Sequence, residues 1–173
     1  MPLQENEIAF SCLFCRTGCE KSISEELNRS NQNVHTFVPS KLRYRRFAGQ
    51  AIEEEVILFP GYIFFAAPTE YWAFQFLNHK LVYRILCMNE GKWQLAGPDK
   101  ALVQRLYESK GAIGFSKAYF ERDRIRILDG FLKEHEGEII RVNKRAQTAQ
   151  IKVTLEGKDI LIWLGYELIS SMT

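Results

Sequence analysis

The chain has 173 residues, of which 46% are hydrophobic and 25% are charged, and its formal net charge is +2. This composition predicts one or two folded domains and excludes the polar, highly charged composition of a disordered chain. A net charge so near zero does not itself indicate a nucleic-acid-binding protein, so local clusters of charge must carry that argument.

The sequence shows no feature of a membrane or secreted protein. No apolar run approaches the roughly 20 residues that a membrane-spanning helix needs. Residues 1–7 (MPLQENE) are polar and acidic, unlike a secretory signal peptide. We therefore expect a cytoplasmic, monomeric protein with no membrane partner.

The first predicted elements are a strand at 8–15, a helix that follows an N-cap at Thr17, and a short strand at 34–39. Thr17 and Glu20 have the spacing of a capping box, and Ile23 and Leu27 lie one helical turn apart on the expected buried side.

Three cysteines follow the spacing Cys12-x2-Cys15-x3-Cys19, which is similar to the spacing of cysteine ligands in metal sites. A strand at 8–15 would place Cys12 and Cys15 on opposite faces, and no second pair of ligands completes a site. We therefore expect buried thiols and neither a metal nor a cofactor.

Residues 41–50 (KLRYRRFAGQ) predict a protruding basic hairpin or loop. Arg43, Arg45 and Arg46 are interleaved with Tyr44 and Phe47, a pattern suited to phosphate contacts and base stacking. The alternative is a solubilising basic loop that pairs with the acidic residues 53–55.

Residues 58–65 (LFPGYIFF) are apolar and interrupted by Pro60 and Gly61, which predicts a corner leading into a buried strand. This corner would leave Phe59 and Tyr62 near the rim of the sheet, where they could serve a partner. The alternative is a core strand entered by a turn.

The remaining segments complete an α+β pattern. A helix beginning at Pro68, a strand at 81–88 and a helix beginning at Pro98 give helices on one side of a sheet. Short alternating strands at 124–128, 138–142, 149–155 and 160–164 predict a small β-barrel. We therefore predict domains at 1–110 and 119–173, joined by a linker at 111–118.

No catalytic pattern emerges. The three histidines lie in separate segments, and no phosphate-binding glycine loop is present. We predict that the chain is not an enzyme, with a catalyst built on the cysteines at 12–19 as the alternative from that class.

Taken together, these motifs resemble the NusG family of transcription elongation factors. Residues 59–62 match the family's F-P-G-Y signature, and residues 14–20 its opening strand, turn and helix. Residues 38–39 match its V-P step, and residues 125–130 with 137–140 are similar to a KOW motif. The resemblance covers residues 8–170 and implies an N-terminal NusG-type α/β sandwich followed by a small KOW (SH3-like) β-barrel.

The resemblance implies docking on the clamp helices and gate loop of bacterial RNA polymerase. The polymerase contacts carried over are Phe10, Phe14, Phe59, Tyr62, Phe64, Trp72 and Phe74. For an RNA hairpin or the non-template DNA strand, the expected contacts are Arg16, Lys41, Arg43, Tyr44, Arg45, Arg46, Lys80 and Arg84.

Two features depart from general family members. Residues 155–158 (LEGK) replace the phenylalanine–glycine pair that contacts Rho or a ribosomal protein, which puts both partners in doubt. Residues 83–84 (YR) replace a small, glycine-bearing stretch. The ending at 142–145 and 162–167 resembles the specialised LoaP antiterminator branch.

The resulting hypothesis is an operon-specific processive antiterminator that binds RNA polymerase and a leader RNA hairpin or displaced DNA strand. The alternatives are a general NusG paralogue that acts by polymerase contact alone and a KOW-type ribosome-associated protein. The second module could also fold as helices in a closed state, but its alternating β-branched residues predict a stable barrel.

Overall fold

The computed structural model describes residues 8–68, 75–86 and 93–169, which form two compact units. Unit 1 comprises the described residues of Met1–Pro39 and Phe59–Gly111, and unit 2 those of Ser40–Leu58 and Ala112–Thr173. The basic hairpin thus groups with the C-terminal strands rather than with the segments that flank it in sequence.

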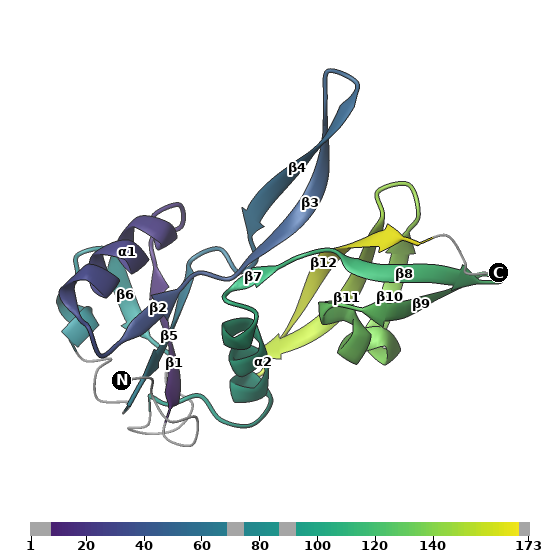
Figure 1. Ribbon diagram of the computed structural model, residues 1–173. Coiled ribbons are helices and arrows are strands. Elements are labelled where there is room, and N and C mark those ends of the chain that lie inside the picture. The colour runs from purple at the N-terminus through teal and green to yellow at the C-terminus, as the bar shows by residue number, and fades with distance from the viewer. Residues whose placement is uncertain (1–7, 69–74, 87–92, 170–173) are drawn as a thin grey trace. The chain divides into compact units, whose positions relative to one another are not determined.

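The described residues of unit 1 form a four-stranded sheet with two α-helices (Figure 1). Its strands follow the order β2-β5-β1-β6, and the sheet is antiparallel. The elements in chain order are β1 (Ala9–Cys15), α1 (Glu20–Ser30), β2 (His35–Phe37), β5 (Tyr62–Ala67), β6 (Val82–Ile85) and α2 (Gly97–Glu108).

The sheet of unit 1 is covered on both faces. Ile23 and Leu27 of α1 pack with Leu13 in one core cluster, as their spacing predicts. On the other face, the ring of Phe10 lies edge-on to Tyr107 of α2, with centroids 5.5 Å apart. Because successive strand residues face opposite sides, β1 is buried on both, which corrects the expectation of helices on one side only.

The start of α1 differs from the predicted capping box. The N-cap is Cys19, and no side chain caps the helix there, so Thr17 does not take that role. Glu20 is the first helical residue and is 1% exposed. Its carboxylate reaches out of the helix to two glycine N–H groups, Gly18 at 2.8 Å and Gly61 at 2.6 Å.

Part of the predicted helix beginning at Pro68 lies outside the described residues. Residues 75–78 form a short 3-10 turn, and Phe76 within it is buried in the core of unit 1.

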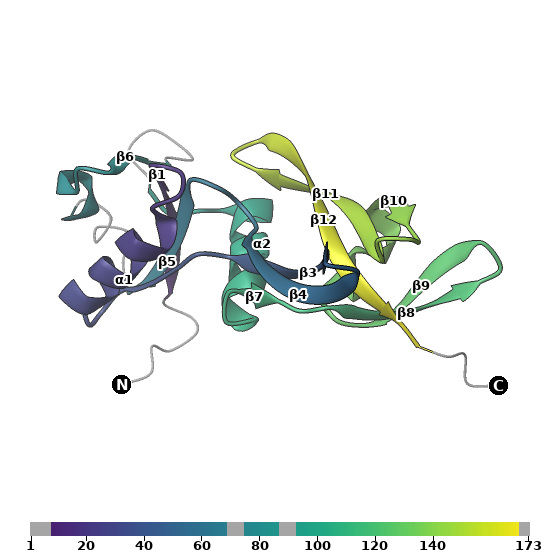
Figure 2. The ribbon, with the colours of Figure 1, turned by 90° about the horizontal axis from the view of Figure 1, so that it is seen from above.

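Unit 2 contains a five-stranded sheet in the order β10-β11-β12-β8-β9 and a three-stranded sheet in the order β4-β3-β7. Figures 1 and 2 show the five strands as one curled, half-barrel sheet. The elements are β3 (Ser40–Phe47), β4 (Gln50–Ile57), β7 (Ala112–Ile113), β8 (Ser116–Glu121), β9 (Arg124–Asp129), η3 (Phe131–Glu138), β10 (Ile139–Asn143), β11 (Thr148–Leu155) and β12 (Lys158–Leu168).

Strand β8 begins inside the predicted linker, and β7 lies within it. The buried positions of β8 are the small residues Ser116 and Ala118, so this strand lacks an apolar alternation. Ser116 is buried because Gly130 lies against it: a Cβ at Gly130 would be 2.7 Å from the Ser116 Cα.

The segment between β9 and β10 is a 3-10 helix, η3, rather than a loop. Leu132 and His135 are its buried residues, and the Leu132 N–H donates to Ser116 Oγ at 3.1 Å. The strands predicted at 124–128, 138–142, 149–155 and 160–164 are all present, so unit 2 is a β structure as predicted. No helix among the described residues is long and apolar enough to cross a membrane.

Candidate functional site

Three hydrogen bonds hold the corner at residues 59–62: one lies within it, one joins it to β1, and one joins it to the Glu20 side chain. Tyr62 N–H donates to the Phe59 carbonyl at 3.1 Å, and Cys15 N–H donates to the Gly61 carbonyl at 2.8 Å. The Gly61 N–H donates to the Glu20 carboxylate. The corner is therefore rigid, and its rim position does not depend on a partner.

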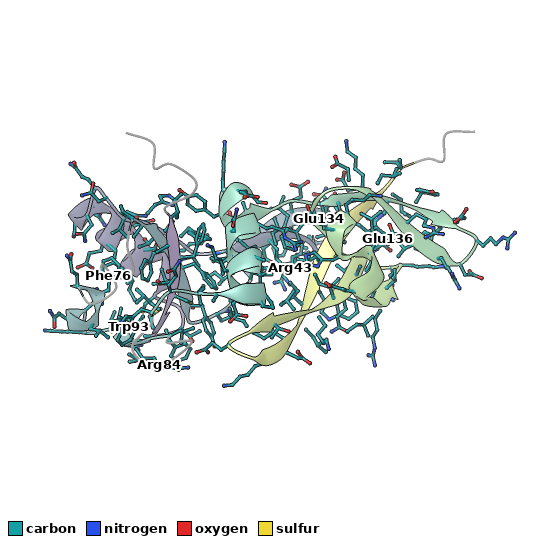
Figure 3. All side chains as sticks on the ribbon, turned by 90° about the horizontal axis from the view of Figure 1, so that it is seen from below. Arg43, Phe76, Arg84, Trp93, Glu134 and Glu136 are labelled. Atoms are coloured by element: carbon teal, nitrogen blue, oxygen red, sulfur yellow. The ribbon has the colours of Figure 1, made fainter. Side chains whose placement is uncertain are left out.

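Three rings at this end of the sheet form what we call the aromatic patch: Phe14, Tyr62 and Tyr83. Phe14 lies opposite Tyr62 in the strand register, with ring centroids 5.3 Å apart, and 6.1 Å from Tyr83. Phe14 and Tyr62 are half-buried, and Tyr83 is 60% exposed. Arg84 places its guanidinium 5.5 Å from the centre of the Phe14 ring (Figure 3).

The other described polymerase-contact candidates lie beneath the surface. Phe10, Phe59 and Phe64 are at most 3% exposed. Phe59 lies edge-on to Phe64 at 5.9 Å, and Phe64 contacts Phe37. These rings support the sheet next to the aromatic patch. Trp72 and Phe74 lie outside the described residues.

Tyr83 is the member of the aromatic patch that sequence reasoning did not assign to polymerase contact. It is adjacent to Phe14 only because β6 pairs with β1, where Phe14 lies opposite Arg84. A pairing between segments about 70 residues apart leaves no local pattern in the sequence.

The basic candidates of unit 1 lie near this end of the sheet. Arg16 N–H donates to the Leu81 carbonyl at 2.9 Å, which places Arg16 beside Lys80. Both side chains are exposed, as is Arg84. The aromatic patch therefore has cationic side chains at its border.

The hairpin of β3 and β4 carries the other basic candidates in unit 2. Its two-residue turn, Ala48 and Gly49, has φ values of 49° and 81°, as a tight hairpin turn requires. Phe47 at the tip is 62% exposed. The predicted hairpin is thus present, with its strands paired from Ser40 to Phe47 and from Gln50 to Ile57.

Two hairpin arginines share one carboxylate. Arg43 Nη2 lies 2.7 Å and Arg45 Nη1 3.5 Å from the Glu54 carboxylate. The hydrogen bond from Arg43 is the main cause that holds the pKa of Glu54 below its usual value. Arg43 and Arg45 therefore pair with an acidic residue of β4, as the alternative interpretation of the basic segment predicted.

Lys41 and Tyr44 are half-buried and make contacts within unit 2. Lys41 Nζ donates to the Trp163 carbonyl at 2.6 Å, and burial, then Arg43, lowers the pKa of Lys41. The Tyr44 ring stacks on Phe115 with centroids 4.4 Å apart and planes 12° from parallel. Its hydroxyl donates to Glu167 at 3.0 Å.

The Cys15 thiol is unsuited to nucleophilic catalysis. Cys12 and Cys15 are buried and Cys19 is partly exposed, and none of the three forms a disulfide. Burial, then the nearby Glu20 and Cys19, raises the pKa of the Cys15 thiol to about 11, so it stays protonated near neutral pH. Across the described residues, no three His, Cys, Asp or Glu side chains are placed to hold a metal ion.

Comparison with known proteins identifies the family. Residues 9–100 match the family model described as transcription termination factor NusG, while no curated protein sequence matches. The chain is also similar to the solved structure described as "Domain interaction in Thermotoga maritima NusG". That match has 15% sequence identity, a TM-score of 0.53 and coverage of 92% of this chain and 94% of that chain, and it shows the fold, α+β with a C-terminal KOW-like sheet. Since the family model covers more than half of the chain, the chain belongs to the NusG family of transcription factors, which are not enzymes.

Proposed function

We propose that this chain is an operon-specific processive antitermination factor, like the LoaP branch of its family. It binds bacterial RNA polymerase through the aromatic patch of unit 1. It also binds a leader RNA hairpin or the displaced DNA strand through its basic side chains. It acts in the cytoplasm, as a monomer.

The observation that carries this proposal is the aromatic patch. Tyr83 is 60% exposed beside the half-buried Phe14 and Tyr62, and exposed clusters of aromatic rings are typical of protein interfaces. The hydrogen bonds of Gly61 hold the corner in one conformation. A rigid surface loses little entropy on docking, which favours affinity.

Cationic side chains at the border of the aromatic patch support the part of the proposal that concerns nucleic-acid binding. Arg16, Lys80 and Arg84 are exposed on unit 1, so a polymerase-bound chain would offer them to nucleic acid leaving the enzyme. Arginine and lysine supply the phosphate contacts that dominate such binding.

The test is a binding assay with purified bacterial core RNA polymerase. We expect Tyr83→Ala to weaken binding by roughly 30-fold, since a central aromatic contact contributes about 2 kcal/mol or more. Leu161→Ala is the matched control, because Leu161 is 54% exposed but lies on β12 of unit 2. Equal affinities of the Tyr83 variant and the unsubstituted chain would contradict the proposed docking surface.

A second candidate is a general family paralogue that acts by polymerase contact alone. The observation in its favour is the pairing of Arg43 and Arg45 with Glu54, which satisfies two hairpin charges within the chain. Its C-terminal unit would then recruit a translation or termination partner, although Glu156 stands in the β11–β12 turn where relatives place an aromatic residue. Selectivity for a hairpin over random-sequence RNA separates the candidates, since only the first predicts it.

A further inference from the structure

Unit 2 contains a pocket of about 370 Å³ between the basic hairpin and the turn that joins β10 to β11. We call it the two-arginine pocket. Its lining residues are Tyr44, Arg46, Ala51, Asn143, Arg145, Ala146 and Gln147. Two of these residues are arginines, and none carries a carboxylate.

The hairpin side of the pocket is held by contacts within unit 2. The Tyr44 ring stacks on Phe115 at 4.4 Å, and its hydroxyl binds Glu167. The bond from Lys41 to the Trp163 carbonyl fixes the base of the same strand. The position of Arg46, two residues beyond Tyr44, is therefore set by packing.

Strand alternation separates Arg46 from the other two arginines. Arg43 and Arg45 share the face of β3 on which Glu54 pairs with them, while Tyr44 and Arg46 share the opposite face. By the same alternation, Glu53 lies opposite Tyr44 on the face of Arg46, but Glu53 is not among the residues that line the pocket.

The turn side of the pocket is also ordered. Ala146 N–H donates to Asn143 Oδ1 at 2.9 Å, and Tyr166 N–H donates to the Gln147 carbonyl at 2.9 Å. Lys144 lies elsewhere: its Nζ is 4.5 Å from the centre of the Phe120 ring and 3.7 Å from Asp123. Of the two neighbouring cations, only Arg145 lines the pocket.

We infer that the two-arginine pocket binds a phosphodiester of the nucleic acid, with Arg46 and Arg145 as its ligands. Guanidinium groups bind phosphate through paired N–H donors, and the volume of the pocket falls in the range of small-molecule sites. The inference rests on the proposed function for its ligand class. It goes further in assigning the β10–β11 turn, and hence the C-terminal unit, a part in nucleic-acid binding.

The test measures binding of a fluorescein-labelled RNA stem-loop and of DNA with the same sequence, over about 50 to 200 mM salt. Arg46→Ala and Arg145→Ala should each weaken binding by about tenfold and lower the slope of log affinity against log salt by about one. Lys144→Ala removes the same charge one residue away and should have little effect. A larger loss with RNA identifies a transcript as the ligand, and a larger loss with DNA identifies the displaced strand; either supports the pocket.

The double variant Arg46→Ala/Arg145→Ala tests whether the two arginines share one ligand. Two side chains on one phosphate should give losses that do not add, whereas separate phosphates give additive losses. Additive losses, or equal losses in the Lys144 and Arg145 variants, overturn the inference.

The experiments distinguish an error in the inference about the pocket from an error in the proposed function. Suppose that the unsubstituted chain binds polymerase and RNA, and that the Arg145→Ala variant binds RNA with the same affinity. In that case the pocket does not bind the phosphodiester, and the proposed function stands. If the unsubstituted chain binds neither RNA nor DNA, the nucleic-acid part of the proposed function fails with it. Circular dichroism and a thermal melt of each variant confirm that the exposed substitutions leave the fold intact.

Discussion

The Glu20 carboxylate accepts the backbone N–H of Gly61 at 2.6 Å and is 1% exposed. One acidic side chain thus joins the start of α1 to the corner that precedes β5, across 41 residues of sequence. The same carboxylate accepts the Gly18 N–H, so the turn before the helix and the corner share one anchor. The orientation of the aromatic patch depends on this anchor.

Replacing Glu20 should therefore destabilise unit 1. Glu20→Ala leaves two N–H groups without their acceptor and should lower the free energy of unfolding by about 2–4 kcal/mol, because hydrogen bonds to charged groups are the stronger class. Glu20→Gln keeps one acceptor oxygen and should lose less. Urea denaturation measures both, and an Ala variant within about 0.5 kcal/mol of the unsubstituted chain would show that the anchor is dispensable.

Gly61 should tolerate no side chain. Its φ is +86°, and a Cβ there would lie 2.8 Å from Phe14 Cε2, so Gly61→Ala adds a steric overlap to backbone strain and should cost about 3 kcal/mol. Gly49→Ala is the matched control, since its φ is +81° but no atom lies within 4 Å of the added Cβ. The control should lose about 1 kcal/mol by strain alone. Equal losses in the two variants would mean that the contact with Phe14 has no effect.

Titration of Cys15 should reduce stability in alkaline solution. Its pKa is about 11 in the folded chain against an ordinary value of 9.0, so the folded state holds this proton more tightly than the unfolded state. Stability from this group is present below pH 9 and is lost as pH rises towards 11. Cys15→Ala should show a shallower decline in unfolding free energy over that window, measured by denaturation at a series of pH values. Parallel curves for the two proteins would refute the assignment.

Freeing the hairpin arginines should strengthen nucleic-acid binding. Glu54→Gln removes the carboxylate that lies 2.7 Å from Arg43, and affinity for RNA should rise by roughly threefold or more as those charges become available to phosphate. Glu25→Gln changes the net charge equally but lies exposed on α1 of unit 1, away from the hairpin in sequence, so it should have a smaller effect. Equal gains in fluorescence anisotropy would show that only total charge matters.

The stack between Tyr44 and Phe115 should hold the hairpin in unit 2. Tyr44→Ala removes this ring contact at 4.4 Å and the bond to Glu167, whereas Tyr44→Phe removes only the bond. Amide hydrogen exchange in β3 and β4 should quicken markedly in the Ala variant and little in the Phe variant. Unchanged exchange in both would mean that the hairpin is ordered by its own strand pairing.

Local sequence patterns predicted the elements that obey strong local rules. Residues 59–62 predicted a corner because Pro60 and Gly61 restrict the backbone in opposite ways, and Ile23 and Leu27 predicted the buried side of α1. Alternation also placed Cys12 and Cys15 on opposite faces. Both are nonetheless buried, because α1 and α2 cover the two faces of the sheet.

The remaining features depend on contacts between distant segments. Glu20 has the spacing of a capping residue, yet its partner Gly61 is 41 residues away. The small residues of β8 gave no apolar signal, and their burial follows from the approach of Gly130 to Ser116. No local pattern around Arg145 predicts the two-arginine pocket, because the pocket also needs the hairpin residues about 100 positions earlier in the chain.

The central claim is that this chain acts on transcription of particular operons through polymerase and RNA together. The most direct measurement is co-purification of the tagged chain with RNA polymerase from its own host, followed by sequencing of the bound transcripts. The account predicts that polymerase is recovered and that leader transcripts of one or a few operons are strongly enriched, with recovery of polymerase lost in the Tyr83→Ala variant. Recovery of polymerase with transcripts in proportion to their abundance, or no recovery of polymerase, would contradict it.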